Sequence, residues 1–362
     1  MTTPTGLVLR EIVPGDIAGL MALARAAFEV DWTDAFVDWK YFQNPAGAAV
    51  GACAVRAGRL VASFSHTPAR LKLGAETTLA MQAVDAMVAP DYRRQKLFAQ
   101  LARQTYQRLD AAGTRLAYVF PAAAVRTPFV GQFGYTEVGA APRFVKVIQG
   151  RMLGASLGRP GPKAWLDRLA AAAGRARASG PAPAPAGLQI SETDQFDARF
   201  DQLWQQVSGG LAIATIRDAA YLTWRYKQNP LHDYVILTAM RADQLAGYVV
   251  LAVQAHQPVA SVVEFMVDPL EAAAGHGLLV EAASRAREAG CAQLQCWMLP
   301  QHTRYVRWLE HAGFVYWPNR LLPGWLRYAT PLIVRSVGGP GLGPAATQLD
   351  NWFLSMGDHD YY

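Results

Sequence analysis

The stretch Val88-Ala89-Pro90-Asp91-Tyr92-Arg93 decides the architecture, because a degraded copy of it, Val267-Asp268-Pro269, stands 179 residues later. The alignment of the two copies extends in both directions without a gap. It pairs Asp85 with Glu264, Met87 with Met266, Pro121 with Pro300, and Gly134 with Gly313. Solenoid repeats have periods of roughly 20–50 residues, so a period this long indicates two copies of a whole domain.

A second shared word lies upstream of the first. Trp39-Lys40-Tyr41-Phe42-Gln43-Asn44-Pro45 corresponds to Trp224-Arg225-Tyr226-Lys227-Gln228-Asn229-Pro230, with an offset of 185 residues. The change of offset predicts a short insertion or deletion between the two words. We expect this word to begin the second strand of each copy, with Asn-Pro making a turn. Trp39 and Tyr41 are then candidates for the edge of a substrate-binding groove, and the alternative is that both pack in the core.

The composition suits two compact domains and an anionic partner. A chain of 362 residues has room for two domains of roughly 150 residues each, and its 52% of hydrophobic residues can supply two cores. The net charge of +6 favours a phosphorylated cofactor or an anionic membrane. No Lys/Arg run is dense enough to indicate a nucleic-acid partner. The three cysteines form no metal-ligand pattern, so we expect reduced thiols and no metal.

The predicted location is cytoplasmic. Residues 1–11 contain no apolar signal segment, and no run of about 18 apolar residues occurs in the chain. The alternative is a peripheral position on the inner membrane.

Hydrophobic periodicity and turn signals predict the same order of elements in both halves. In the first half we expect a long strand at 77–88, a loop at 90–96, an amphipathic helix at 97–112 and a buried strand at 115–120. The second half repeats this order from a strand at 261–267 onward.

The domain boundaries follow from shifts in composition. Residues 1–149 and 188–335 are predicted to be the two domains. Residues 150–187 are predicted to be a linker that combines a basic helix with a stiff Pro/Ala spacer. Residues 336–362 contain a Gly/Pro stretch and an acidic aromatic tail.

The unit of strand, tight loop, helix, strand and helix, ending in Phe133-Gly134-Tyr135, resembles motifs of the GNAT acyltransferase superfamily. The resemblance covers about residues 8–148 and 190–330. It implies an α/β (α+β) fold class with two tandem GNAT-type domains, each a mixed, mainly antiparallel sheet flanked by helices. In this family a Gln/Arg-x-x-Gly-x-Gly/Ala loop follows a Val-x-Pro strand end and binds the diphosphate of coenzyme A (CoA).

Each copy keeps only part of that loop. The first copy reads Arg93-Arg94-Gln95-Lys96-Leu97-Phe98, so cations are present but the glycines are missing. The second copy keeps Gly275 and Gly277 but has no Lys or Arg between residues 268 and 277. Because cations favour phosphates, we place acyl-CoA or acetyl-CoA in the first copy and predict a structural role for the second. The reverse assignment, or no CoA site at all, is the alternative.

The resemblance implies a set of cofactor-binding residues in the first copy: Met87, Val88, Arg93, Arg94, Gln95, Lys96, Leu97 and Phe98.

Transfer to an amine needs a base for the amine and a proton donor for the departing thiolate. GNAT proteins often use a Glu on the long strand, and Asp85 and Glu264 occupy this position in the two copies. The alternative for both is an ion-paired strand carboxylate. His66 is a second candidate base. The family's usual Tyr donor is replaced by Val130 and Leu309, so Tyr118 and Tyr135 become candidate donors, with core packing as the alternative for each.

The implied function is acyl-CoA-dependent N-acyltransfer to an amine. The hydrophobic composition and the ten Trp favour a long-chain acceptor such as a sphingoid base, the substrate of bacterial ceramide-synthase-type enzymes. The linker helix expected at 163–177 is predicted to connect the two domains, and the alternative is a weak contact with anionic membranes. Two other functions stay open. One is an acetyltransferase for a small amine such as an amino sugar, amino acid or antibiotic, and the other is a non-catalytic CoA-binding or interaction protein.

Overall fold

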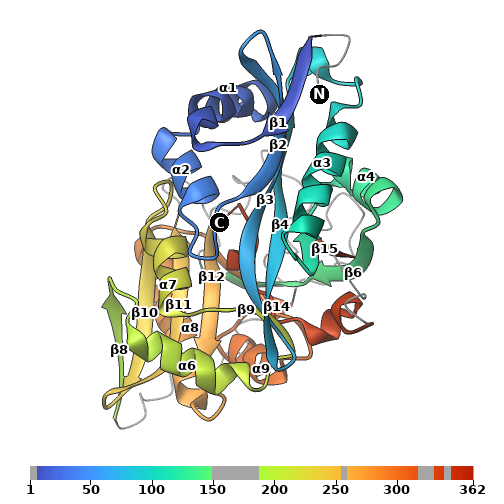
Figure 1. Ribbon diagram of the computed structural model, residues 1–362. Coiled ribbons are helices and arrows are strands. Elements are labelled where there is room, and N and C mark those ends of the chain that lie inside the picture. The colour runs from blue at the N-terminus through green and yellow to red at the C-terminus, as the bar shows by residue number, and fades with distance from the viewer. Residues whose placement is uncertain (1–5, 149–186, 254–258, 317–329, 338–343, 362) are drawn as a thin grey trace, which may run out of the picture. The chain divides into compact units, whose positions relative to one another are not determined.

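The computed structural model describes residues 6–148, 187–253, 259–316, 330–337 and 344–361 (Figure 1). These residues belong to two compact units, which are treated separately below. Unit 1 comprises Met1–Gly139, Gln228–Leu231 and Pro331–Leu349, and unit 2 comprises Ala140–Lys227, His232–Thr330 and Asp350–Tyr362. The predicted linker helix and spacer lie outside the described residues, as does most of the Gly/Pro stretch after residue 337.

Unit 1 is built on a mixed sheet with the strand order β1-β2-β3-β4-β5-β15-β6. The strands are β1 (Leu7–Glu11), β2 (Val50–Arg56), β3 (Arg59–Leu73), β4 (Glu76–Val88), β5 (Leu116–Val119), β6 (Thr136–Ala141) and β15 (Thr330–Ser336). The pairs from β1 to β4 are antiparallel, whereas β4 and β5 are parallel. A parallel pair needs a crossover connection, and the helix α3 (Leu97–Ala111) provides it.

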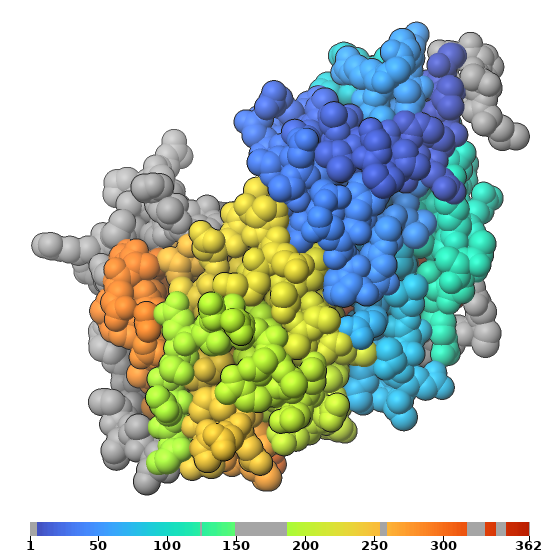
Figure 2. Space-filling view, turned by 60° about the vertical axis from the view of Figure 1, so that its left-hand side comes forward, coloured from blue at the N-terminus to red at the C-terminus, as the bar shows by residue number. Residues whose placement is uncertain are grey.

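Helices cover both faces of this sheet. The helices α1 (Ile17–Phe28) and α2 (Asp34–Phe42) share one core cluster with Cys53 of β2. The helix α3 and the helix α4 (Ala123–Phe133) share the other cluster, which contains Ala52 and Ala54. Successive residues of a strand point to opposite faces, so α1 and α3 lie on opposite sides of β2 in Figure 1. The residues of α1 and α2 form part of the blue surface in Figure 2.

Unit 2 repeats this arrangement with the strand order β8-β10-β11-β12-β13-β7-β14. The strands are β7 (Arg143–Val147), β8 (Leu188–Thr193), β10 (Tyr234–Arg241), β11 (Gln244–Val253), β12 (Val259–Val267), β13 (Gln293–Trp297) and β14 (Val315–Tyr316). The remaining elements are α6 (Ala198–Ser208), β9 (Ile213–Thr215), α7 (Ala219–Leu222), a π-helix (Thr223–Lys227), α8 (Ala272–Glu288) and α9 (Thr303–His311). Again one central pair, β12 and β13, is parallel.

The sixth strand of each sheet comes from the other half of the sequence. The strand β15 pairs with β5 in unit 1, and β7 pairs with β13 in unit 2. Only Pro142 separates β6 from β7, which is too short for a hairpin, so the chain leaves one sheet and enters the other. The strand β7, which falls inside the predicted first domain of residues 1–149, therefore belongs to the sheet of unit 2.

The predicted fold class is confirmed, because each unit is a mixed sheet flanked by helices. The expectation that the Trp-Lys/Arg-Tyr word begins a strand is wrong. In the first copy the word lies in α2, whose first turn is capped by Thr33 through a 3.2 Å bond from Phe36 N. Helical spacing then places Val37 and Tyr41 on one buried face.

Candidate functional site

The loop between β4 and α3 has a backbone shape that suits an anion. Arg94 and Lys96 both adopt left-handed conformations, with φ of 63° and 59°. Lys96 is the residue before the first turn of α3, and no side chain caps that turn. The first N–H groups of a helix have no partner within it, and a turn with alternating handedness gathers further N–H groups into a concave nest. The left-handed conformation of Lys96 suits the glycine that the family's loop has at this position.

A pocket of about 550 Å³ opens on this loop. Four cationic side chains line it: Arg93, Arg94, Lys96 and Arg103. The other lining residues are Val88, Tyr92, Leu97, Phe98, Ala99, Pro128 and Gln132. The pocket therefore combines a cationic wall with an apolar one, which suits a ligand that carries both phosphate and apolar groups.

The four cations differ in how far they are already engaged. The Arg93 guanidinium makes long 3.4 Å bonds to the carbonyl oxygens of Val88 and Ala27, which tie the loop to the end of α1. Arg94, Lys96 and Arg103 form no ion pair with an acidic residue of the described ranges. All three are exposed, so they are the cations available to an anionic ligand.

The structure brings most of the predicted cofactor residues together. Val88, Arg93, Arg94, Lys96, Leu97 and Phe98 all line the pocket. Met87 does not line it and is fully buried in the core under α1 and α2. The Gln95 side chain turns back and donates to the Asp91 carbonyl oxygen at 3.2 Å.

Sequence reasoning missed Tyr92, Ala99, Arg103, Pro128 and Gln132 as lining residues. The spacing of Lys96, Ala99 and Arg103 by three and four positions is a helical stripe that sequence alone offers. Pro128 and Gln132 belong to α4, and only the tertiary fold brings them to the pocket.

Asp85 lies at a β-bulge in β4. The register of β3 and β4 shifts there, and Asp85 has a φ of 49°. The bulge turns its carboxylate toward α2, where Lys40 Nζ lies at 2.8 Å and the Tyr41 hydroxyl donates at 3.1 Å. The side chains of Lys40 and Asp85 are only 8% and 7% exposed, so this is a nearly buried ion pair. Trp39 and Tyr41 are themselves buried, at 3% and 0% exposure.

The same tyrosine–carboxylate bond occurs in unit 2. The Tyr226 hydroxyl donates to Glu264 at 3.1 Å, as Tyr41 does to Asp85. The two shared words of the sequence repeat thus meet in space in both copies. The cation differs, because Arg225 donates to the carbonyl oxygens of Gly357 and His359 instead.

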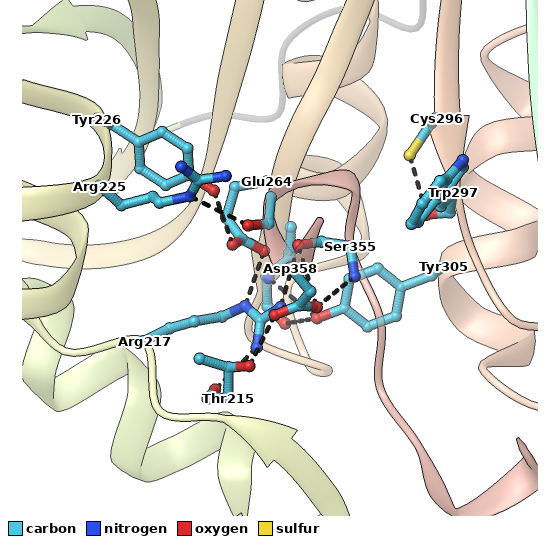
Figure 3. Close-up of polar contacts among 12 residues, drawn as sticks. Thr215, Arg217, Arg225, Tyr226, Glu264, Cys296, Trp297, Tyr305, Ser355 and Asp358 are labelled. Atoms are coloured by element: carbon cyan, nitrogen blue, oxygen red, sulfur yellow. Dashed lines mark hydrogen bonds and ion pairs between the residues drawn. The ribbon is translucent and has the colours of Figure 1, made fainter. Parts of the chain in front are cut away.

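In unit 2 the cation that pairs with the Glu264 carboxylate is Arg217, which also binds the C-terminal segment through Asp358 (Figure 3). Its guanidinium binds Glu264 and Asp358, each at 2.8 Å, and Ser355 at 3.0 Å. Thr215 adds a 2.7 Å bond to Asp358. Glu264 has no exposed surface, and burial raises its pKa while Arg217 opposes that rise. This geometry makes Glu264 an anchor for the C-terminal segment.

The glycines of the second copy's motif serve helix packing. Gly275 and Gly277 lie inside α8, not in a loop before it. A side chain at Gly275 would meet the Trp308 ring at 2.5 Å, and one at Gly277 would meet Ile190 at 2.6 Å. The residue before the helix is Glu271, which forms an ion pair with Arg241 at 2.7 Å. A carboxylate at this helix end disfavours a phosphate.

Comparison with known proteins gives a family match within the N-terminal copy. Residues 8–138 match the family model described as an acetyltransferase (GNAT) domain. The N-terminal copy contains a GNAT domain. A search of curated proteins found no significant match to the sequence.

Solved structures extend the likeness to both copies of the fold. A GCN5-related N-acetyltransferase from Anabaena variabilis has a TM-score of 0.62 at 12% identity, over 91% of this chain and 72% of that one. One from Kribbella flavida has a TM-score of 0.58 at 14% identity, over 92% and 72%. Saccharomyces cerevisiae N-myristoyltransferase with bound myristoyl-CoA and inhibitors has a TM-score of 0.60 at 11% identity, over 94% and 82%. At these identities the likeness is one of fold.

The other predicted catalytic residues of the GNAT domain lie in its core. His66 has no exposed surface, and neither ring nitrogen has a hydrogen-bond partner among the described residues. Burial, with a smaller effect from Arg335, lowers the pKa of His66 to about 3. Tyr118 is 4% exposed, and Tyr135 shares a 3.2 Å hydrogen bond with Tyr106. None of the three lines the pocket.

Within the described ranges, no three His, Cys, Asp or Glu side chains are grouped so that they could hold a metal ion. Among the described helices, none has the length and apolar character needed to cross a bilayer.

Proposed function

We propose that this chain is an acyl-CoA-dependent N-acyltransferase whose donor site is the pocket of the GNAT domain. The observation that supports this best is that one pocket combines three features: a helix start with no side-chain cap, two loop residues in the left-handed conformation, and three cations without acidic partners among the described residues. These features together suit a diphosphate. The second copy lacks the cations and is assigned a structural role.

The pantetheine arm has a path beside β4. The parallel pairing joins Ala80–Gln82 to Leu116–Tyr118 and then stops, although β4 continues to Val88. The strand β5 ends at Val119, so the end of β4 that borders the pocket has no β5 partner beside it. We propose that the thioester of acyl-CoA lies beside this end of β4 while the diphosphate stays on the loop before α3.

The reaction needs two proton movements. The amine nitrogen attacks the thioester carbonyl, a C–N bond forms, the C–S bond breaks, and the sulfur leaves with the electron pair. A base accepts the proton from nitrogen, and a donor protonates the thiolate. We propose Asp85 as the base, because the β4 bulge turns its carboxylate out of the strand, and bulges often re-aim side chains beside active sites. Its contact with Lys40 makes a purely structural role the competing explanation.

We further propose a long-chain acyl donor and an amphiphilic amine acceptor such as a sphingoid base. The likeness of fold to a transferase with bound myristoyl-CoA supports this, as does the hydrophobic composition of the chain. Each CH₂ buried adds about 0.8 kcal/mol, so long-chain acyl-CoA should outcompete acetyl-CoA. A preference for acetyl-CoA and small amines would favour the small-amine acetyltransferase instead.

Isothermal titration calorimetry with CoA tests the donor site. We expect Arg94→Glu to weaken CoA binding by more than about tenfold, because a charge-assisted contact is lost and repulsion is added. Arg115→Glu is the control, since Arg115 is also an exposed cation but does not line the pocket and instead pairs with Glu76 at the first residue of β4. Unchanged CoA affinity in the Arg94 variant would remove the basis of the proposal. CoA binding without thiol release on any amine would identify a non-catalytic binding protein.

A further inference from the structure

Arg103 is a cation of the pocket that the loop motif does not account for. It lies on α3, in the turn after the one that contains Ala99, and both residues line the pocket. Lys96, Ala99 and Arg103 are spaced by three and four positions, so they form one stripe along the helix. Arg103 is exposed and forms no ion pair with an acidic residue of the described chain. Its charge therefore extends the cationic wall away from the loop.

The lining of the pocket differs between its two ends. At one end it includes Val88, the last residue of β4, where β5 no longer pairs with β4. Away from Val88 it runs along α3 to Arg103 and faces Gln132 of α4. Coenzyme A likewise differs between the two sides of its diphosphate. The pantetheine arm on one side of the diphosphate is uncharged, and the ribose on the other side carries a 3′-phosphate.

We infer that Arg103 recognises the ribose 3′-phosphate of CoA and so selects CoA over ligands that lack this group. The inference rests on the proposed function, since it takes the loop as the diphosphate site. With the diphosphate at Arg94 and Lys96, the uncharged arm points to Val88 and the 3′-phosphate points to Arg103. The fourth cation, Arg93, is bonded to the carbonyl oxygens of Val88 and Ala27. An arginine fits a phosphate by donating two parallel N–H bonds.

Calorimetry with CoA and with dephospho-CoA, which lacks only the 3′-phosphate, tests this inference. We expect the unmodified protein to bind CoA about tenfold more tightly than dephospho-CoA, the low end for a charge-assisted contact because Arg103 is exposed. Arg103→Ala should weaken CoA binding to the level of dephospho-CoA and leave dephospho-CoA binding unchanged. Arg103→Lys should restore part of the difference. Arg115→Ala, which removes the same charge outside the pocket, should preserve the full difference.

The outcomes separate this inference from the function on which it rests. Equal binding of the two ligands by the unmodified protein, or equal loss of both in Arg103→Ala, overturns the role of Arg103 while CoA binding itself stands. Failure of both ligands to bind overturns the proposed donor site and the inference together.

Discussion

Replacing Lys96 by glycine and, separately, by alanine distinguishes the backbone strain of the loop from its charge. Lys96 has a φ of 59° and a ψ of 17°, and it lines the pocket at the start of α3. Both variants remove the ammonium group. Only glycine also removes the clash of Cβ that makes the left-handed region costly for other residues.

The two variants should differ in stability but not in affinity for CoA. The left-handed conformation costs a non-glycine residue roughly 1–2 kcal/mol, and glycine loses roughly 0.5–1 kcal/mol more than alanine through backbone entropy. Lys96→Gly should therefore be more stable than Lys96→Ala by roughly 0.5–1 kcal/mol. For CoA, both variants should lose about the same affinity, about 1 kcal/mol or fivefold, because Lys96 is exposed and its contact is partly screened.

Chemical denaturation gives the stabilities and calorimetry gives the affinities. The same pair of substitutions at Gln107, in the interior of α3, is the control, and there alanine should be more stable than glycine by about 1 kcal/mol. Greater stability of Lys96→Ala than Lys96→Gly would show that the loop does not hold a left-handed residue at this position. Full CoA affinity in Lys96→Gly would show that the ammonium group does not touch the ligand.

Three further predictions follow from the site and the core. Asp85→Asn should lower kcat by about 10²–10⁴ with little change in CoA affinity. Glu264→Gln, which disturbs the matching tyrosine–carboxylate pair in unit 2, should leave kcat unchanged. Similar kcat values in the two folded variants would show that the role of Asp85 is structural. Gly275→Ala should destabilise unit 2 by about 1–3 kcal/mol through the Trp308 contact without affecting CoA binding. Gly131→Ala in α4, where nothing lies within 4 Å of the added Cβ, should not destabilise unit 1. A loss of CoA affinity in Gly275→Ala would indicate that the donor site lies in the second copy. The folded-state pKa of His66, about 3, lies below its ordinary value of 6.5, so the unfolded chain takes up the proton first as the pH falls. Stability should therefore fall below pH 6.5 by up to about 1.4 kcal/mol per pH unit, and His66→Leu should flatten that part of the stability profile; an unchanged slope would show that His66 is not buried as a neutral ring.

The sequence repeat predicted the paired architecture because both copies keep the same local signals at the same spacing. Gly134 and Gly313, matched in the alignment, both follow the last helix of their copy with positive φ, of 70° and 84°. The loop from Arg93 to Phe98 was found for a similar reason. Its cations, the strand before it and the amphipathic helix after it are neighbours in sequence, and a helix start exposes its N–H groups wherever it occurs.

Contacts between distant segments left no such signal. The pairing of Lys40 and Tyr41 with Asp85 joins residues about 45 positions apart, and periodicity placed their word on a strand when it is a helix. The sequence analysis assigned no contacts to the acidic aromatic tail, yet Trp352, Phe353 and Met356 are buried in unit 2. The tail's partner, Arg217, lies more than 130 residues earlier in the chain. The hydrophobic pattern of the sequence does not show that an acidic segment forms an ion pair with this buried arginine.

The sequence by itself therefore determined that the fold is repeated, the order of the strands and helices around the loop at Arg93 to Phe98, and that this loop presents cations at a helix start. The tertiary structure decided which side chains complete the pocket, which carboxylates are ion-paired, and which sheet receives β7 and β15. The physical reason is the range of the interactions. Helix starts, turns and amphipathic faces are set by residues a few positions apart in the sequence. Strand exchange and buried ion pairs instead require closing loops of tens to hundreds of residues. The entropy cost of closing such a loop varies only slowly with its length, so loop length does not indicate which distant segment becomes the partner.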